Sequence, residues 1–182
     1  TIVYNEFGVR LLYAENVSVI KSNITNNLYW GITFYSSRKN LLEKNRMLDN
    51  SGGVDIHYSS SINITDNEFN NGSWCGIYMY FDEKITIVGN KFSMFTFADV
   101  VSYGGDKLVT ITNNTHSTYK VGVGFWGYYG SSSNITITNN AINISEQHYD
   151  YPTAIIFDST YYAYGNITIA NNTIYGLYGG IE

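Results

Sequence analysis

The chain has 182 residues, of which 14% are charged, and its formal net charge is −5 at pH 7. Nucleic-acid binding needs clustered Lys and Arg to replace the counterions around phosphates, so we expect no nucleic-acid partner. No apolar run reaches the roughly 20 residues that a spanning helix needs, and we expect no membrane span. A hydrophobic content of 44%, with 16% aromatic residues, argues against disorder.

An eight-residue pattern, apolar-x-apolar-x-x-Asn-x-apolar, recurs along the chain. In chain order its copies are residues 17–24 and 40–47, which are degenerate, and then 62–69, 85–92, 109–116, 135–142 and 167–174. The sixth position is spaced by 23, 22, 23, 24, 26 and 32 residues, and it is occupied by Ser22, Asn45, Asn67, Asn90, Asn114, Asn140 and Asn172. A nearly constant period of this size indicates a solenoid.

A second pattern, Gly-apolar-x-apolar, repeats in phase with the first. Its copies are residues 8–11, 31–34, 53–56, 76–79 and 122–125, with looser copies at 154–156 and 180–182. Alternation with period two predicts short strands in which alternate side chains turn inward. The glycine permits a corner that a Cβ would obstruct.

A coil of about 23 residues cannot bury its apolar face alone, so coils must stack, at about 4.8 Å. The sequence therefore predicts an all-β, right-handed parallel β-helix, a single domain over residues 1–182. We expect about seven coils of 22–26 residues, one of them longer. A leucine-rich repeat would need a Leu-rich consensus, and a propeller blade would need about 40 residues.

The stacking makes two local predictions. Asparagines at one bend should form a ladder of hydrogen-bonded amides, which we expect for Asn67, Asn90 and Asn140. Equivalent isoleucines should share one core, and the expected members are Ile62, Ile64, Ile85, Ile87, Ile135, Ile137, Ile167 and Ile169. The lone Cys75 should pack as a small apolar residue.

Units of the form Asn-Ile-Thr-Ile-x-x-Asn-x-Ile, at residues 134–142 and 166–174, resemble the repeats of pectate-lyase-like β-helix proteins. The resemblance covers residues 8–182. The Asn- and Tyr-rich, Lys-poor sequence is most similar to archaeal and bacterial adhesin-like surface proteins. It implies an extracellular or cell-surface structural protein that acts through self-association or through other surface proteins. The alternative is a carbohydrate-active or carbohydrate-binding protein, a polysaccharide lyase or hydrolase, because this fold serves both classes.

Catalysis on polysaccharides would need two carboxylates roughly 5–9.5 Å apart. The first outward position of the second strand reads Arg10, Thr33, Asp55, Tyr78, Ser102 and Gly124. Asp55 is the only acid in that row, and with His57 it forms the candidate acid–base pair. Without a second carboxylate, we expect the pair to be an exposed Asp and His that are not catalytic.

Calcium is the cation that such a lyase would use, held by several clustered carboxylates. The only adjacent acidic pair, Asp82 and Glu83, lies in a turn, where we expect it to cap the backbone or face solvent. No specific calcium site is visible, and we predict no metal site and no cofactor.

Aromatic residues give the stronger surface signal. The next outward position reads Leu12, Tyr35, His57, Tyr80, Gly104, Trp126 and Phe157. The predicted contact residues are Tyr35, Tyr80, Trp126, Phe157, Tyr29 and Trp74. Such rings could pack against another chain, hold the sugar rings of a polysaccharide, or cover one another.

Nine Asn-x-Ser/Thr sequons are candidate glycosylation sites in an exported protein. They lie at Asn16, Asn23, Asn63, Asn71, Asn113, Asn134, Asn143, Asn166 and Asn171. The alternative is that these asparagines follow the repeat consensus for structural reasons. The chain also begins and ends within a coil, from which we expect a segment of a longer protein or an uncapped assembly subunit.

Overall fold

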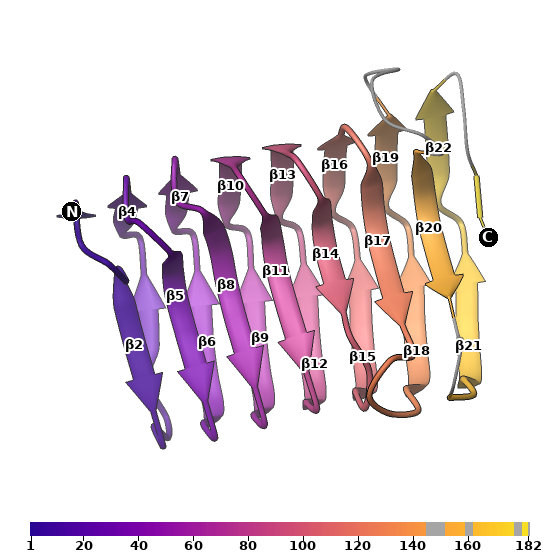
Figure 1. Cartoon of the computed structure of the whole chain (residues 1–182), viewed down its shortest axis with the longest axis horizontal. Helices are drawn as coiled ribbons and strands as arrows, with labels where there is room; N and C mark the ends of the chain where they lie inside the picture. The colour runs from indigo at the N-terminus through magenta and orange to yellow at the C-terminus, as the bar shows by residue number, and fades with distance from the viewer. Residues whose placement is uncertain (145–151, 159–161, 177–179, 182) are drawn as a thin grey trace.

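The computed structural model describes residues 1–144, 152–158, 162–176 and 180–181, and it shows a parallel β-helix with three strands in each coil (Figure 1). Successive coils lie side by side along one axis, and the strands of each sheet are all parallel. This confirms the predicted fold. Among the described residues there is no helix able to cross a membrane.

Each side of the coil contributes one sheet. Sheet A contains β1 (Ile2–Val3), β4 (Asn23–Thr25), β7 (Arg46–Leu48), β10 (Glu68–Gly72), β13 (Lys91–Phe95), β16 (Thr115–Thr118), β19 (Ala141–Ile144) and β22 (Thr173–Gly176). Sheet B contains β2 (Val9–Leu12), β5 (Trp30–Tyr35), β8 (Gly52–His57), β11 (Cys75–Tyr80), β14 (Ala98–Ser102), β17 (Val121–Trp126) and β20 (Thr153–Asp158). Sheet C contains β3 (Ser18–Ile20), β6 (Arg38–Glu43), β9 (Ser60–Thr65), β12 (Glu83–Val88), β15 (Lys107–Thr112), β18 (Ser133–Thr138) and β21 (Gly165–Ala170).

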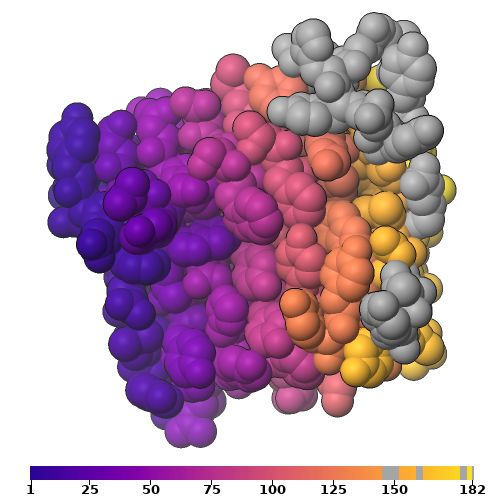
Figure 2. All heavy atoms as spheres, in the orientation of Figure 1, coloured from indigo at the N-terminus to yellow at the C-terminus, as the bar shows by residue number. Residues whose placement is uncertain are grey.

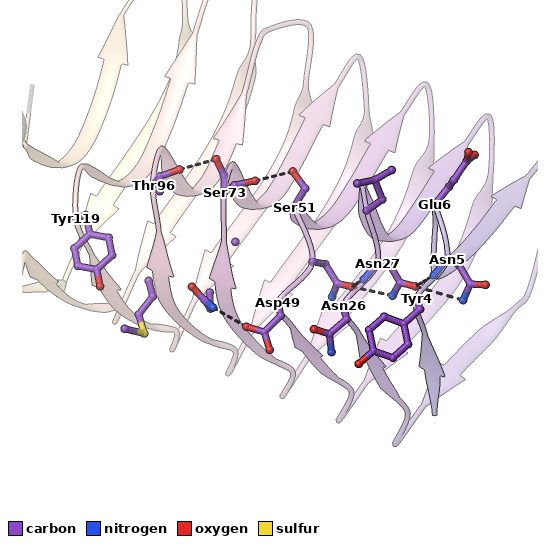
Figure 3. A pocket seen from close by; sticks show the side chains of 15 residues that line it. Tyr4, Asn5, Glu6, Asn26, Asn27, Asp49, Ser51, Ser73, Thr96 and Tyr119 are labelled. Carbon is purple, nitrogen blue, oxygen red and sulfur yellow. Dashed lines mark hydrogen bonds between the residues drawn. The ribbon is translucent and has the colours of Figure 1, made fainter.

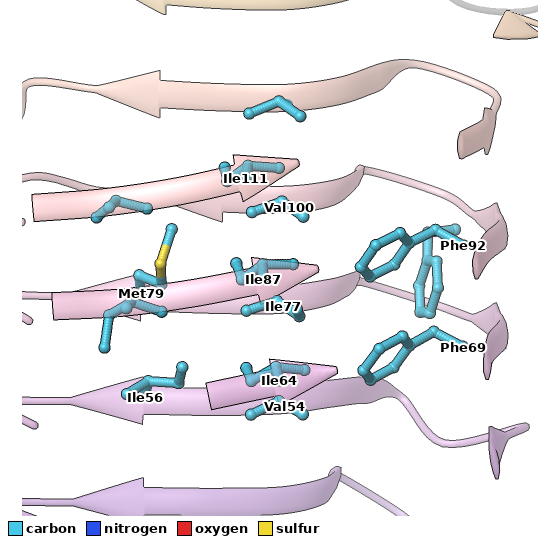
Figure 4. Close-up of a cluster of buried hydrophobic side chains, with 14 of the residues drawn as sticks. Val54, Ile56, Ile64, Phe69, Ile77, Met79, Ile87, Phe92, Val100 and Ile111 are labelled. Carbon is cyan, nitrogen blue, oxygen red and sulfur yellow. The ribbon is translucent and has the colours of Figure 1, made fainter. Parts of the chain in front are cut away.

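The core is a set of rows in which equivalent residues of successive coils touch. Ile64, Ile87 and Ile111 form one row from sheet C, in register and fully buried (Figure 4). Phe69 and Phe92 of sheet A close the core with parallel rings whose centroids are 4.9 Å apart. The predicted core residues Ile62, Ile64, Ile85, Ile87, Ile135 and Ile137 are all buried.

The last coil departs from that prediction. Ile167 is exposed, and Ile169 is only partly buried against the core. Both belong to β21, the outermost strand of sheet C, which pairs with β18 on one side only. Ile167 and Ile169 nevertheless continue the inward rows of Ile135 and Ile137, their buried register partners.

The asparagine ladder forms at the corner between sheets C and A. The Asn90 Oδ1 atom accepts hydrogen bonds from the backbone N–H of Asn67 (2.9 Å) and from its Nδ2 (3.0 Å). The Asn67 amide also donates to the Leu42 carbonyl, 3.0 Å away. The same arrangement repeats along the axis through Asn45, Asn114, Asn140 and Asn172. Each buried amide is thereby paired, which confirms the predicted ladder.

The recurring glycine near the start of the sheet B strands lies where the next coil approaches closely. A Cβ on Gly76 would lie 2.6 Å from the Asp99 carbonyl oxygen and would also meet the Phe92 ring. In the following coil Asp99 stands where the glycine recurs, and its side chain is fully buried. Its carboxylate contacts Nδ1 of the buried His116 at 3.2 Å, and His116 stacks on Phe92. Burial raises the pKa of Asp99.

The register of sheet C makes a direct prediction. Ile87→Asp would place an unpaired charge in the core and should lower the free energy of unfolding by several kcal/mol. Thr86→Asp is the matched control, because its side chain points outward from the same strand and should change stability by less than about 1 kcal/mol. Chemical denaturation of both variants measures the difference, and equal stability would show that the register is wrong.

Candidate binding face on sheet B

The outer face of sheet B holds most of the residues predicted to be functional, and Figure 2 shows this side of the molecule. Its first outward row reads Arg10, Thr33, Asp55, Tyr78, Val101 and Gly124. Val101 occupies the position that was predicted for Ser102, so the predicted register was wrong by one residue in this coil. Ser102 instead pairs with Met79 and is buried, and Tyr103 rather than Gly104 continues the second outward row.

Asp55 and His57 contact each other on the outer face of β8. The Asp55 Oδ1 atom lies 2.7 Å from His57 Nε2, and both side chains are partly exposed. The His57 ring packs between aromatic neighbours, with its centroid 5.3 Å from that of Tyr78 and 6.4 Å from that of Tyr35. The register neighbours of Asp55 are Thr33 and Tyr78, so no second carboxylate lies beside it. The row lacks the second acid that glycoside hydrolysis requires.

A groove of about 610 Å³ runs beside this pair. Its walls are mainly aromatic, and Asp55, His57 and Arg10 supply the ionisable groups. The Arg10 guanidinium lies over the Phe7 ring, 4.6 Å from its centroid. The lining residues are Phe7, Arg10, Leu12, Tyr13, Tyr29, Trp30, Thr33, Tyr35, Asp55 and His57. Flat apolar walls with a few polar groups suit a ring-shaped ligand.

Further along the axis, the same face is covered by its own side chains. Trp126 is only 9% exposed and stacks on Phe97 (5.4 Å) and Tyr103 (5.8 Å). With Cys75 and Val101, it belongs to a small apolar cluster outside the sheet. The prediction of Trp126 as an open contact residue was therefore wrong. Cys75 is buried as expected, and burial raises the pKa of its thiol.

Phe157 was also misplaced by one residue. It pairs with Phe125 rather than with Trp126, whose partner is Asp158. The Phe125 and Phe157 rings stack with centroids 5.1 Å apart, and Phe157 packs against the core. It cannot contribute to an outward surface.

The four other predicted contact residues are accessible. Tyr35, Tyr29 and Trp74 are exposed, and Tyr80 is half-buried. Tyr29 packs on Phe7 (5.3 Å), and Trp74 stacks on Phe97 (5.0 Å). These rings are therefore accessible although each packs against another ring of the same face.

The structure adds an aromatic ridge that the sequence prediction missed, at the corner between sheets B and C. We define the corner ridge as Tyr13, Tyr35, Tyr58, Tyr80 and Phe81. Tyr58 and Phe81 are 49% and 38% exposed and stack with centroids 5.9 Å apart. Tyr58 also meets Tyr35 and Tyr80 edge-on, at 5.8 and 5.6 Å. The signal in the sequence was an apolar or aromatic pair ending the second strand, as in 12–13, 57–58 and 80–81.

A buried polar ladder supports the ridge from below. The backbone N–H of Ser59 donates to Asp82 Oδ1 (2.7 Å), and the N–H of Asp82 donates to Asp106 Oδ1 (2.6 Å). The Ser102 hydroxyl donates to the other Asp106 oxygen. Both carboxyls are buried, and desolvation raises the pKa of Asp82 and raises that of Asp106 to about 7.

Asp82 and Glu83 therefore do not act as an acidic pair. Asp82 is buried and caps backbone N–H groups, as predicted for this turn, whereas Glu83 is exposed. Within the described ranges no three His, Cys, Asp or Glu side chains come together as metal ligands. The absence of a calcium site stays a prediction.

The nine sequon asparagines are all exposed. Six of them have a positive φ near 55°: Asn16, Asn71, Asn113, Asn134, Asn166 and Asn171. Asparagine tolerates this left-handed conformation better than most residues, so the backbone of the coil explains why it recurs there. Glycosylation stays a prediction, and for these six positions a structural reason exists without it.

Comparison with known proteins gives one family and a small group of similar structures. A family model described as a right-handed β-helix region matches residues 1–116. A crystal structure of PfbA, a surface adhesin of Streptococcus pneumoniae, superposes with a TM-score of 0.52 at 15% identity, covering 93% of this chain and 62% of that chain. A second PfbA structure gives 0.50 at 15% identity, with 95% and 68% covered. No curated protein sequence matches the chain. At this identity the structural likeness concerns the fold.

The buried acids predict an unusual pH dependence. Asp106 has a folded-state pKa of about 7 against an ordinary value of 3.8, so the folded state keeps a proton that the unfolded state has lost. Stability should therefore fall as pH rises from about 4 to about 7. Asp106→Asn should reduce this fall, because Asn carries no proton to lose, and between pH 4 and pH 8 the variant should lose roughly 2–4 kcal/mol less stability than wild type. Asp82 and Asp99, whose pKa values are also raised by burial, should account for any remaining fall.

Chemical denaturation at both pH values measures this effect. Asp66→Asn is the control, because Asp66 is exposed and its positive φ suits Asn equally well. If Asp106→Asn keeps the wild-type pH dependence, then Asp106 does not hold a proton in the folded protein.

Proposed function

The chain belongs to the right-handed β-helix family, and we propose that it is an adhesin-like protein of the cell surface that associates with other proteins through sheet B. The observation that carries this proposal is the corner ridge, where exposed aromatic rings from successive coils touch one another. Aromatic side chains dominate the energetics of protein interfaces because they bury large areas at a small entropic cost.

The charge distribution supports association. The corner ridge contains no charged side chain, and the whole protein carries few charges. A second copy, or a neighbouring surface protein, would therefore approach the ridge with little electrostatic repulsion. Exposed aromatic rings in a continuous patch also favour a partner that removes them from water.

The structural neighbours support the surface location. Both similar structures are of a surface adhesin, and this chain spans 62% and 68% of their lengths. The exposed sequons are compatible with an exported protein. Extracellular or cell-surface localisation is therefore part of the same proposal.

A second candidate function is carbohydrate binding in the sheet B groove. It rests on the aromatic walls around Asp55 and His57, since sugar rings pack face-on against such walls. With one carboxylate at this position, the groove suits binding better than hydrolysis.

Association through the corner ridge can be tested by sedimentation velocity over a range of protein concentrations. Wild type should form larger species as concentration rises, and Tyr58→Lys/Phe81→Lys should weaken association by more than about tenfold. Lysine suits both positions, because Lys21 and Lys44 already adopt a similar positive φ at the corner between sheets C and A.

Leu108→Lys is the matched control, since Leu108 is exposed, has a positive φ and lies on sheet C. Thermal melting should show that all variants remain folded. A wild-type protein that stays monomeric throughout, or a Leu108→Lys variant as defective as the ridge variant, would contradict self-association through the ridge.

A further inference from the structure

A second groove, of about 890 Å³, follows the corner between sheets A and B (Figure 3). Six successive coils line it, and one residue from each is Tyr4, Asn26, Asp49, Asn71, Met94 and Tyr119. At about 4.8 Å per coil, the groove runs for about 24 Å along the axis. It shares no lining residue with the sheet B groove.

One wall of this corner groove is a row of hydroxyl groups. The Ser51 and Ser73 Oγ atoms are 2.9 Å apart, and the Thr96 hydroxyl donates to the Ser73 carbonyl at 2.6 Å. Figure 3 shows the three side chains in line, one from each coil. Ser73 and Thr96 are exposed, so their oxygen atoms remain available to a ligand.

The other wall has polar groups in its middle and aromatic or apolar groups at its two ends. The Asn71 amide donates to the Asp49 carboxylate at 2.6 Å, and both residues have a positive φ at the corner. Tyr4, 81% exposed, flanks one end of the groove, and Tyr119 lies at the other end. The exposed Met94 also lines the groove, from the coil before that of Tyr119. The groove therefore offers hydrogen-bonding groups along one side, and on the other side it offers both polar groups and exposed aromatic or apolar surface.

The charge of the groove is negative. Glu6 and Asp49 are its ionisable carboxylates, and none of its lining residues is Lys, Arg or His. An anionic ligand would meet repulsion here with no cation to offset it.

We propose that the corner groove binds an uncharged linear polysaccharide. A sugar ring presents hydroxyl groups at its edge and apolar C–H surface on its faces, which matches the two walls. In an extended polysaccharide each ring advances by a distance close to the coil spacing, so successive rings meet equivalent side chains. The negative charge of the groove favours this uncharged ligand over acidic uronans, which it would repel.

An extended peptide fits the same groove less well. Its residues advance by about 3.3 Å and fall out of step with coils spaced at about 4.8 Å. A peptide that adds to a sheet also needs an open strand edge along its length. Here the strands cross the groove direction, and those of the inner coils are paired on both sides.

The test is affinity electrophoresis of the whole chain in native gels containing galactomannan, xylan, mixed-linkage β-glucan or polygalacturonate. At least one neutral polysaccharide should retard wild type, and polygalacturonate should not. Ser51→Ala/Ser73→Ala/Thr96→Val should raise the dissociation constant about tenfold or more, since three hydrogen-bonding groups are removed.

Two controls separate this site from the others. Thr86→Ala/Thr110→Ala/Thr136→Ala removes a comparable row of hydroxyls, in register on the outside of sheet C, and should leave binding within about twofold of wild type. Tyr35→Ala/His57→Ala alters the sheet B groove and should also leave it unchanged. Any of four outcomes would overturn the proposal. Binding could be lost in the sheet B variant or retained in the Ser51, Ser73 and Thr96 variant. Alternatively, polygalacturonate could bind as well as a neutral polysaccharide, or none of the three neutral polysaccharides could bind. If the groove does not bind polysaccharide, the proposal of association through the corner ridge is unaffected, because sedimentation tests it separately.

Discussion

Every feature of this molecule depends on the register between one coil and the next. Backbone hydrogen bonds fix that register in three sheets, and buried polar side chains fix it again at the corners. The asparagine ladder is the clearest example, because each amide pairs with the backbone and the side chain of its neighbour. A shifted coil would leave several of these buried groups unpaired, at a cost of roughly 1–3 kcal/mol each.

The same register turns a short repeat into extended surfaces. Residues 22–26 positions apart become neighbours, so one aromatic in each coil is enough to form a ridge and one hydroxyl in each coil is enough to form a row. The corners matter most for the surface. Their left-handed residues turn side chains outward that an alternating strand would place differently, as Tyr58 and Phe81 show. The corner ridge and the corner groove lie at opposite ends of the sheet B strands, so one coil can serve two surfaces.

The sequence predicted the architecture well because the fold depends on periodic features. Ile85 and Ile87 alternate with polar residues and recur at a fixed interval, which is enough to place them in the core. The errors arose where this alternation fails. Val100 and Val101 are consecutive apolar residues, as are Ile155, Ile156 and Phe157, so the pattern alone could not say which of them faces inward. The burial of Trp126 depends on Phe97 and Tyr103, one coil away, and nothing local to Trp126 indicates it.

Disulfide trapping would test the coil-to-coil register most directly. Thr86 and Thr110 are register partners on the outside of sheet C. Cysteines at both positions should oxidise to a disulfide, because adjacent strands bring their Cα atoms within the roughly 4.4–6.8 Å that the bond requires. Thr86→Cys/Thr112→Cys should stay reduced, because a two-residue offset places the pair about 8 Å apart. A disulfide in the second variant but not in the first would contradict the register on which both proposed surfaces rest.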